Sequence, residues 1–222
     1  MKTKPKAAKE TAKPTSNTWI YVLIGVVIVL GLIYVSYKSY LESKKIEYAG
    51  LNFEQKKFGD LNFYYTRIPL FAKDKITGNM VNTVNYSMYL RNDPRTLEDI
   101  KIEGMIRIKS KTILASEAGL QCENNGIAGG ELGQAIGLWT TVITGTSNKT
   151  LADNRSIPYV SCNASEGMYL DSTSLSFKVA NVTGISQKGA DCYEISVANC
   201  EILEAVERFI VGAYAHSRGI EI

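Results

Sequence analysis

The chain has 222 residues, of which 45% are hydrophobic, so it is apolar enough to fold into one ordinary domain or two small ones. Its formal net charge of +3 comes from the first 18 residues, which hold five Lys and one Glu, and the rest is close to neutral. This distribution excludes a disordered polyelectrolyte and a nucleic-acid-binding domain with a basic surface.

An uninterrupted apolar segment follows the basic tail. Residues 19–37 are nineteen residues without a charge, and a helix of that length, rising about 1.5 Å per residue, spans roughly 28 Å, close to the ~30 Å bilayer core. Basic residues are more numerous before the segment, so the positive-inside rule places residues 1–18 in the cytoplasm and the C-terminal part outside. The segment exceeds the ~7–15 residues of a signal-peptide core, and no small-x-small site follows it. We therefore predict an uncleaved, single-pass signal anchor in the cell membrane.

Residues 38–60 are predicted to form a juxtamembrane helix and a linker. Apolar residues keep a helical spacing among charged ones as far as Tyr48, and Gly50 is expected to end the helix. A spacer is the favoured interpretation, and pairing with a partner helix is the alternative. Phe53 and Phe58 flank two Lys, a combination that would seat the domain on lipid headgroups.

The first part of the outer domain, from residue 61, has the pattern of β-strands. Residues 61–71 are rich in aromatic and apolar side chains, and Pro69 favours a sheet edge. Residues 84–90 alternate between apolar and polar, and residues 100–109 place four Ile on one face and charged side chains on the other. Long alternating strands joined by turns predict an antiparallel sheet.

The remainder mixes helices and strands. A helix is predicted over residues 127–138, capped by Asn124 or Asn125. Short strands are predicted at residues 139–144, 158–162, 175–182 and 193–197.

The chain closes on its clearest amphipathic helix. Asn199 is the expected N-cap, and Glu204 faces Arg208 at the i,i+4 spacing of an exposed ion pair. The order of elements predicts an α+β domain over residues 61–222 that is rich in antiparallel sheet and has two helices, the last one C-terminal. A subdivision near residue 116 is part of this expectation.

All four cysteines lie beyond the anchor: Cys122, Cys162, Cys192 and Cys200. An even number of cysteines on the outer side of a membrane predicts two disulfides. If residues 193–197 are extended, Cys192 and Cys200 lie roughly 20 Å or more apart, whereas a bridge needs Cα atoms within about 7 Å. This disfavours the pairing of Cys192 with Cys200. The two connectivities that tie the loops of Cys122 and Cys162 to the C-terminal strand and helix both stay open.

Five Asn-x-Ser/Thr sequons lie in the outer part, at Asn85, Asn148, Asn154, Asn163 and Asn181. Their number supports export through an N-glycosylating route, with unused sequons as the alternative. Asn85 and Asn181 fall in predicted strands and need outward-facing positions. Asn148 and Asn154 flank a predicted exposed turn and are the better candidates.

No residue pattern of an enzyme or of a cofactor site stands out. The glycine-rich residues 126–137 follow no buried strand and lack Gly-Lys-Ser/Thr, so a smooth helix face is expected instead of a phosphate loop. His216, the sole histidine, is interpreted as a solvated residue or a helix-dipole partner, and no CxxC or HxxxH pair suggests a metal. We predict no catalytic, metal-binding or cofactor-binding residues. An enzyme with a non-histidine mechanism is the least favoured alternative.

Two segments, YSMYLRNDPR (residues 86–95) and DCYEISVANCEILEAVERF (residues 191–209), resemble uncharacterised single-pass envelope proteins of small-genome archaea. The resemblance implies an archaeal envelope protein and supplies no functional residue. The expected function is a non-enzymatic, disulfide-stabilised, membrane-anchored binding or assembly protein of the cell envelope, with an accessory subunit of a membrane protein complex as the alternative. The expected partners are the lipid bilayer and other envelope or membrane proteins, without nucleic acid. The sequence predicts no oligomeric state.

Overall fold

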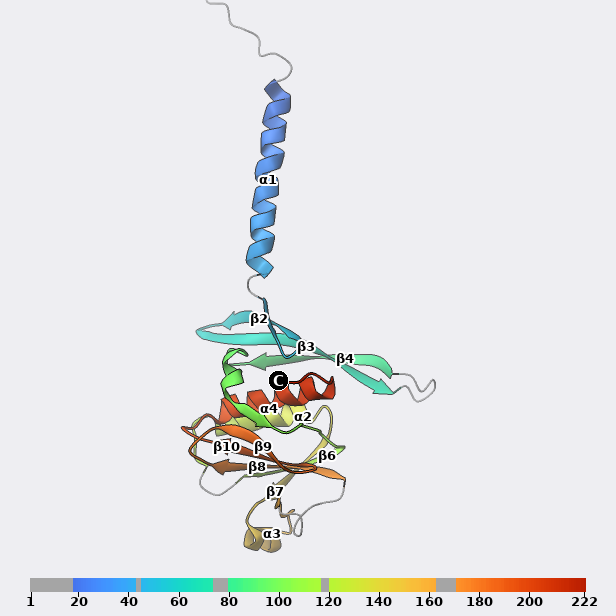
Figure 1. The fold of residues 1–222 in the computed structure, drawn as a ribbon, viewed down its shortest axis with the longest axis vertical. Helices are drawn as coiled ribbons and strands as arrows, with labels where there is room; N and C mark the ends of the chain where they lie inside the picture. Colours follow the sequence, from blue (N-terminus) through green and yellow to red (C-terminus); the bar gives the residue numbers. More distant parts are fainter. Residues whose placement is uncertain (1–17, 43–44, 74–79, 117–119, 163–170) are drawn as a thin grey trace, which may run out of the picture. The chain divides into compact units, whose positions relative to one another are not determined.

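The computed structural model describes residues 18–42, 45–73, 80–116, 120–162 and 171–222 (Figure 1). The chain divides into two compact units, Met1–Lys44 and Lys45–Ile222. The first unit contains helix α1 (Thr18–Glu42), which includes the one helix segment among the described residues that is long and apolar enough to cross a membrane. The predicted anchor is therefore a helix. The predicted basic tail lies outside the described residues, apart from Thr18.

The second unit begins earlier than predicted, with two strands in place of the juxtamembrane helix and linker. Strands β1 (Lys45–Tyr48) and β2 (Leu51–Phe58) form a hairpin joined by Ala49 and Gly50, both at positive φ. Positive φ at both turn positions is the geometry that matches the twist of two antiparallel strands. Phe53 is fully buried in the core, and its burial explains why this stretch joins the domain.

Sheet A is a four-stranded antiparallel meander in the order β1-β2-β3-β4, with β3 at Leu61–Lys73 and β4 at Met80–Leu90. The strands predicted at 61–71 and 84–90 are confirmed. Pro69 does not mark an edge strand, because β3 lies between β2 and β4. However, β2 pairs with β3 only as far as Tyr65, so Pro69 sits where β3 has a neighbour on one side alone.

Sheet B has six strands in the order β5-β9-β10-β8-β6-β7. The bounds in that order are Lys101–Glu103, Gly184–Gly189, Cys192–Val197, Ser172–Val179, Lys111–Ser116 and Thr141–Thr146. Strands β9 and β10 are antiparallel, and the other neighbouring pairs are parallel. The prediction of an antiparallel sheet is therefore correct for sheet A, whereas sheet B is mixed. The stretch predicted as a strand at 158–162 forms a single bridge, between Tyr159 and Thr146.

Helices α2 (Asn125–Ile136) and α4 (Ile202–Ser217) lie between the two sheets (Figure 1). Buried side chains from both sheets and both helices form one hydrophobic cluster, so residues 45–222 are a single compact unit without the predicted division near residue 116. Two further helical segments, α3 (Lys149–Arg155) and the 3₁₀ helix η1 (Thr96–Asp99), were not predicted.

The C-terminal helix differs from the predicted amphipathic helix because a sheet lies on each side of it. It starts at Ile202, and the expected N-cap Asn199 has a positive φ of 49° in the preceding turn. Arg208 is buried and does not pair with Glu204 among the contacts of the described residues. Instead, its Nε donates to the carbonyl of Ile100 at 3.0 Å and its Nη1 donates to the Tyr48 hydroxyl. These two bonds tie α4 to β1 and to the end of η1.

Candidate functional site

Both predicted disulfides form, and the structure decides between the two connectivities. Cys122 is bonded to Cys200 and Cys162 to Cys192, with Cα–Cα distances of 5.4 and 5.6 Å. The first bridge joins the turns that precede α2 and α4. Two disulfides and one apolar N-terminal helix fit a membrane-anchored protein whose domain lies on an oxidising side of the membrane.

The sequon asparagines within the described ranges are exposed: Asn85, Asn148, Asn154 and Asn181. Asn148 also caps α3, because its side-chain oxygen accepts from Leu151 N at 3.1 Å. Asn181 lies in the turn after β8 instead of in a strand. Asn163 lies outside the described residues. Exposure satisfies the requirement for glycosylation, which stays a prediction.

A cavity of about 330 Å³ lies beside the C-terminal end of α4, and we call it the His216 pocket. Its lining comes from residues 105–108, from Trp139 after α2, and from Ala213, His216 and Ser217 of α4. These three segments are far apart in sequence. Their side chains are mainly apolar, with an imidazole and a guanidinium among them.

The first wall of the pocket is the segment that the alternating Ile pattern assigned to a long strand. Strand β5 ends at Glu103, and Gly104 turns the chain at a φ of 97°. The backbone N–H groups of the next residues are bonded to side chains instead of to a neighbouring strand. Met105, Ile106, Arg107 and Lys109 donate to Gln187, His216, Tyr193 and Thr173 respectively, at 2.7–3.1 Å. The pattern correctly predicts burial of Ile106, but not a partner strand.

His216 is a half-buried part of the pocket wall, contrary to the interpretation of a solvated residue. Its Nδ1 accepts the hydrogen bond from Ile106 N at 2.8 Å, which places the proton of the neutral ring on Nε2. Burial, followed by the nearby positive charge of Arg208, lowers the pKa of His216 below its usual value. The imidazole is therefore neutral at pH 7 and offers one N–H donor.

Arg107 supplies a positive charge to the same pocket. It is exposed, and its one side-chain hydrogen bond within the described residues goes to Met105 Sδ at 3.5 Å. No carboxylate lines the pocket. The Ser217 hydroxyl donates back to Tyr214 O at 2.6 Å. The pocket thus combines an apolar wall with donor groups from Arg107 and His216, which suits an apolar ligand that carries an acceptor or an anionic group.

A second polar cluster lies at the turn between β4 and η1, and its carboxylates are enclosed by the fold. The buried Glu207 carboxylate accepts from Arg91 N and from Asn92 N and Nδ2, the latter two at 3.1 and 2.9 Å. Burial raises the pKa of Glu207 to about 8. Burial also raises the pKa of Glu131 to about 7, although the Arg91 guanidinium at 3.6 Å opposes the shift.

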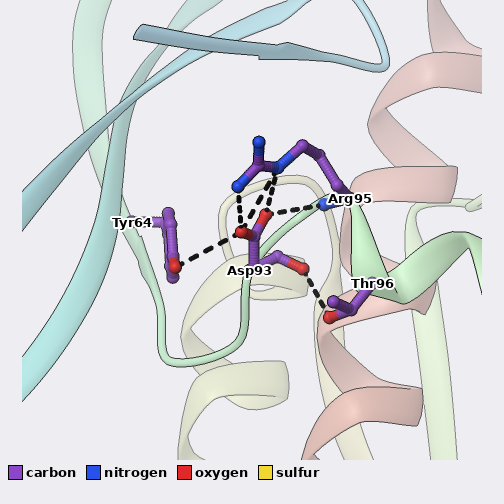
Figure 2. A network of polar contacts seen from close by, with 4 residues as sticks. All are labelled: Tyr64, Asp93, Arg95 and Thr96. Carbon is purple, nitrogen blue, oxygen red and sulfur yellow. Dashed lines mark hydrogen bonds and ion pairs between the residues drawn. The ribbon is translucent and has the colours of Figure 1, made fainter. Parts of the chain in front are cut away.

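The same turn is held on its other side by Asp93, as Figure 2 shows. The Asp93 carboxylate accepts from the Arg95 guanidinium and from the Tyr64 hydroxyl, the latter at 3.4 Å, and the Thr96 hydroxyl donates to Asp93 O at 2.8 Å. These contacts give the cluster a structural role: they fix the chain reversal between the two sheets.

Comparisons with protein-family models, with curated proteins and with solved structures find no match to this chain. The resemblance to archaeal envelope proteins stays a prediction. Among the described residues, no group of three or more His, Cys, Asp or Glu is arranged to hold a metal ion. Sequence reasoning missed the pocket because Arg107, Trp139 and His216 form no local motif. The presence of a single histidine was the one available signal.

Proposed function

We propose that the protein is a membrane-anchored, extracytoplasmic binding protein of the cell envelope, whose ligand is a small apolar molecule with one acidic group. The observation that carries this proposal is the His216 pocket, an apolar cavity of about 330 Å³. It contains a neutral imidazole and a guanidinium that forms no ion pair with the described residues. Cavities of about 300–1,000 Å³ with an apolar lining and a few oriented polar groups are typical of small-molecule sites.

The charges around the pocket favour an anion over a cation. Arg107 has no ion pair among the described residues, and the lining contains no acidic side chain. A helix end usually attracts cations through its free carbonyls. Here the carbonyls of Ala215 and His216 already accept from the backbone N–H groups of residues 218–220. A carboxylate near Arg107 is thus the group that the site complements.

The proposed extracytoplasmic location is supported by the apolar helix and by the disulfides. One apolar helix and two disulfides support a domain outside the cytoplasm, where thiols are oxidised. Alkylation of the unreduced protein in its native membrane tests this location, and modification of all four cysteines would contradict it. A non-enzymatic role is supported by the hydrogen bonds of the pocket, because His216 Nδ1 and the Ser217 hydroxyl are both engaged with backbone groups.

The test is ligand binding by the full chain in lipid nanodiscs. Trp139 lines the pocket, and the variant Trp19→Phe leaves it as the sole tryptophan, while His216 gives the sole histidine ring signal in NMR. Phenylacetate and phenylacetamide have the same shape and differ in charge. For a ligand of this size we expect a Kd of about 1 mM, with phenylacetate bound up to about fivefold more tightly than the amide.

Two variants separate the roles of the polar groups. His216→Asn retains an acceptor for Ile106 N and removes the Nε2–H donor, so the fold is preserved while binding of both probes weakens. Arg107→Gln abolishes the preference for phenylacetate over the amide. Arg155→Gln, an exposed change on α3, is the matched control and leaves binding unchanged. The proposal fails if neither probe gives a saturable signal or if all three variants behave alike.

A further inference from the structure

The face of sheet A that points away from α4 carries exposed aromatic and aliphatic side chains. Phe58 pairs with Leu61 between β2 and β3, so both side chains lie on one face, and Phe63 follows Leu61 at the two-residue period of a strand. Phe58 is 56% exposed, Leu61 54% and Tyr89 41%. The opposite face of the sheet holds core residues such as Phe53. Of the two aromatics that the sequence suggested for lipid contact, Phe58 alone is on the surface.

The rings form a connected cluster. Ring centroids of Phe58 and Phe63 are 5.7 Å apart, those of Phe63 and Tyr89 6.4 Å, and those of Tyr65 and Tyr89 4.9 Å. Phe58 and Tyr89 are exposed, Phe63 is half-buried and Tyr65 is buried. Adjoining exposed apolar side chains indicate a surface that is covered in the assembled state. We call this set, together with Leu61, the aromatic face.

Two cations adjoin the aromatic face. Lys56 Nζ lies 3.6 Å from the centre of the Tyr65 ring, and Arg67 Nε donates to the Tyr65 hydroxyl. Neither cation has a carboxylate within ion-pair distance in the part of the chain that the structure describes. Glu54, which is paired with Tyr65, is an acidic side chain on the same face. The aromatic face therefore has a positively charged border.

Sheet A follows the membrane anchor closely in the sequence. Helix α1 ends at Glu42 and β1 begins at Lys45, so two residues of the chain separate them. When α1 spans the bilayer, sheet A is therefore the part of the domain that follows the membrane anchor directly along the chain.

We propose that the aromatic face docks on the anionic lipid surface of the membrane that α1 crosses. Aromatic rings belong at the level of the headgroups, and Lys and Arg beside them reach the lipid phosphates while their stems stay on apolar surface. Docking through sheet A leaves the surface of sheet B, on the far side of α2 and α4, facing away from the bilayer. This inference is independent of the His216 pocket.

The test measures contact with lipid in the full chain reconstituted into nanodiscs. In a background without the native tryptophans (Trp19→Phe, Trp139→Phe), Phe58→Trp places a fluorophore on the aromatic face. Val182→Trp places one in the turn between β8 and β9 of sheet B, where Val182 is 75% exposed. Lipids brominated near the top of the acyl chain quench tryptophan on contact. We expect quenching for Phe58→Trp and none for Val182→Trp.

The role of charge is tested by composition and by variants. Discs with equal parts of phosphatidylglycerol and phosphatidylcholine are compared with discs of phosphatidylcholine alone. Adding Lys56→Gln and Arg67→Gln to Phe58→Trp should lower the ratio of docked to undocked domain about 30-fold in the anionic discs. Lys149→Gln with Arg155→Gln, both exposed on α3, is the matched control and should change nothing.

Each remaining outcome overturns the proposal. Equal quenching in neutral and anionic discs would overturn the anionic surface as the partner. Absence of quenching for Phe58→Trp in both kinds of disc would leave a protein as the occupant of the aromatic face. Equal quenching for Val182→Trp would mean that the whole domain collapses onto lipid without a preferred face.

Discussion

The carboxyl groups of Glu207, which is buried, and of Glu131, which is partly buried, make stability depend on pH in a direction opposite to that of most surface acids. Burial raises the pKa of Glu131 from 4.5 to about 7 and that of Glu207 to about 8. The folded state therefore binds protons more tightly than the unfolded state. The resulting stabilisation is fully present below about pH 4.5 and is lost as the pH rises through 7 and 8.

The magnitude follows from the number of protons that the folded state holds in excess. Each such proton changes the free energy of unfolding by about 1.4 kcal/mol per pH unit. Between pH 6.5 and 7.5 the two carboxyls together hold about 1.4 extra protons on average, so the free energy of unfolding should fall by about 2 kcal/mol. The lowered pKa of His216 acts in the opposite direction, but mainly below pH 6.5.

Glu131→Gln is the informative change. Glu131 Oε2 is buried and has no hydrogen-bond partner among the described residues, so the substitution breaks no hydrogen bond at this atom. Of these residues, Arg91 is the one ion-pair partner that loses the negative charge. The variant should lose about a third of the pH dependence between pH 6.5 and 7.5. Glu207→Gln is less useful, since the amide would place an N–H group against the donors of Asn92. Guanidinium unfolding of the full chain in detergent, followed by near-ultraviolet circular dichroism, measures the slope.

Glu204→Gln, a change at a partly exposed position of α4, is the control and should keep the parent slope. A flat profile of the parent protein between pH 6.5 and 7.5 would refute the reasoning. The same conclusion would follow if Glu131→Gln left the slope unchanged.

Two further predictions concern the disulfides and one sequon. Replacing Cys122 and Cys200 by Ser opens a loop of 78 residues and should lower the free energy of unfolding by about 4 kcal/mol, measured by thermal unfolding without reductant. An unchanged melting temperature would contradict this. Thr183→Val removes buried bonds to Glu201 and Ala198 and should cost about 1–3 kcal/mol, whereas Asn181→Gln, which removes the same sequon, should cost nothing. Equal melting temperatures of the two variants would refute the structural role of Thr183.

The features predicted correctly from the sequence are those that local patterns determine. An apolar run needs only length to become α1. Aromatic and apolar composition places β3, and period-two alternation places β4, without knowledge of their neighbours. The cysteine pairing was narrowed by the extended strand β10, which keeps Cys192 and Cys200 apart. In each case the deciding residues lie within one element.

The failures come from contacts that no local pattern contains. The helical spacing after α1 did not reveal that Phe53 would be buried in a core completed by residues more than a hundred positions later. The Ile alternation over 100–109 predicted a strand, but His216 and Tyr193 take the hydrogen bonds that a neighbouring strand would provide. His216 and Tyr193 belong to distant elements, so the alternation of Ile residues over 100–109 carries no information about them.

The position of α4 between two sheets accounts for both the buried charges and the pocket. An amphipathic helix normally turns its polar residues to water, but α4 has sheet A on one side and sheet B on the other, so its polar residues must find partners inside. Glu207 accepts a hydrogen bond from Asn92 after β4, and Arg208 donates one to Ile100 after η1. His216 accepts one from Ile106, in the chain between β5 and β6. The segment that His216 holds is not a strand, and it forms one wall of the His216 pocket. His216 thus has two roles, one in holding this segment through Ile106 and one in lining the pocket. A change at His216 that spares the Ile106 bond should therefore alter ligand binding and leave the fold intact.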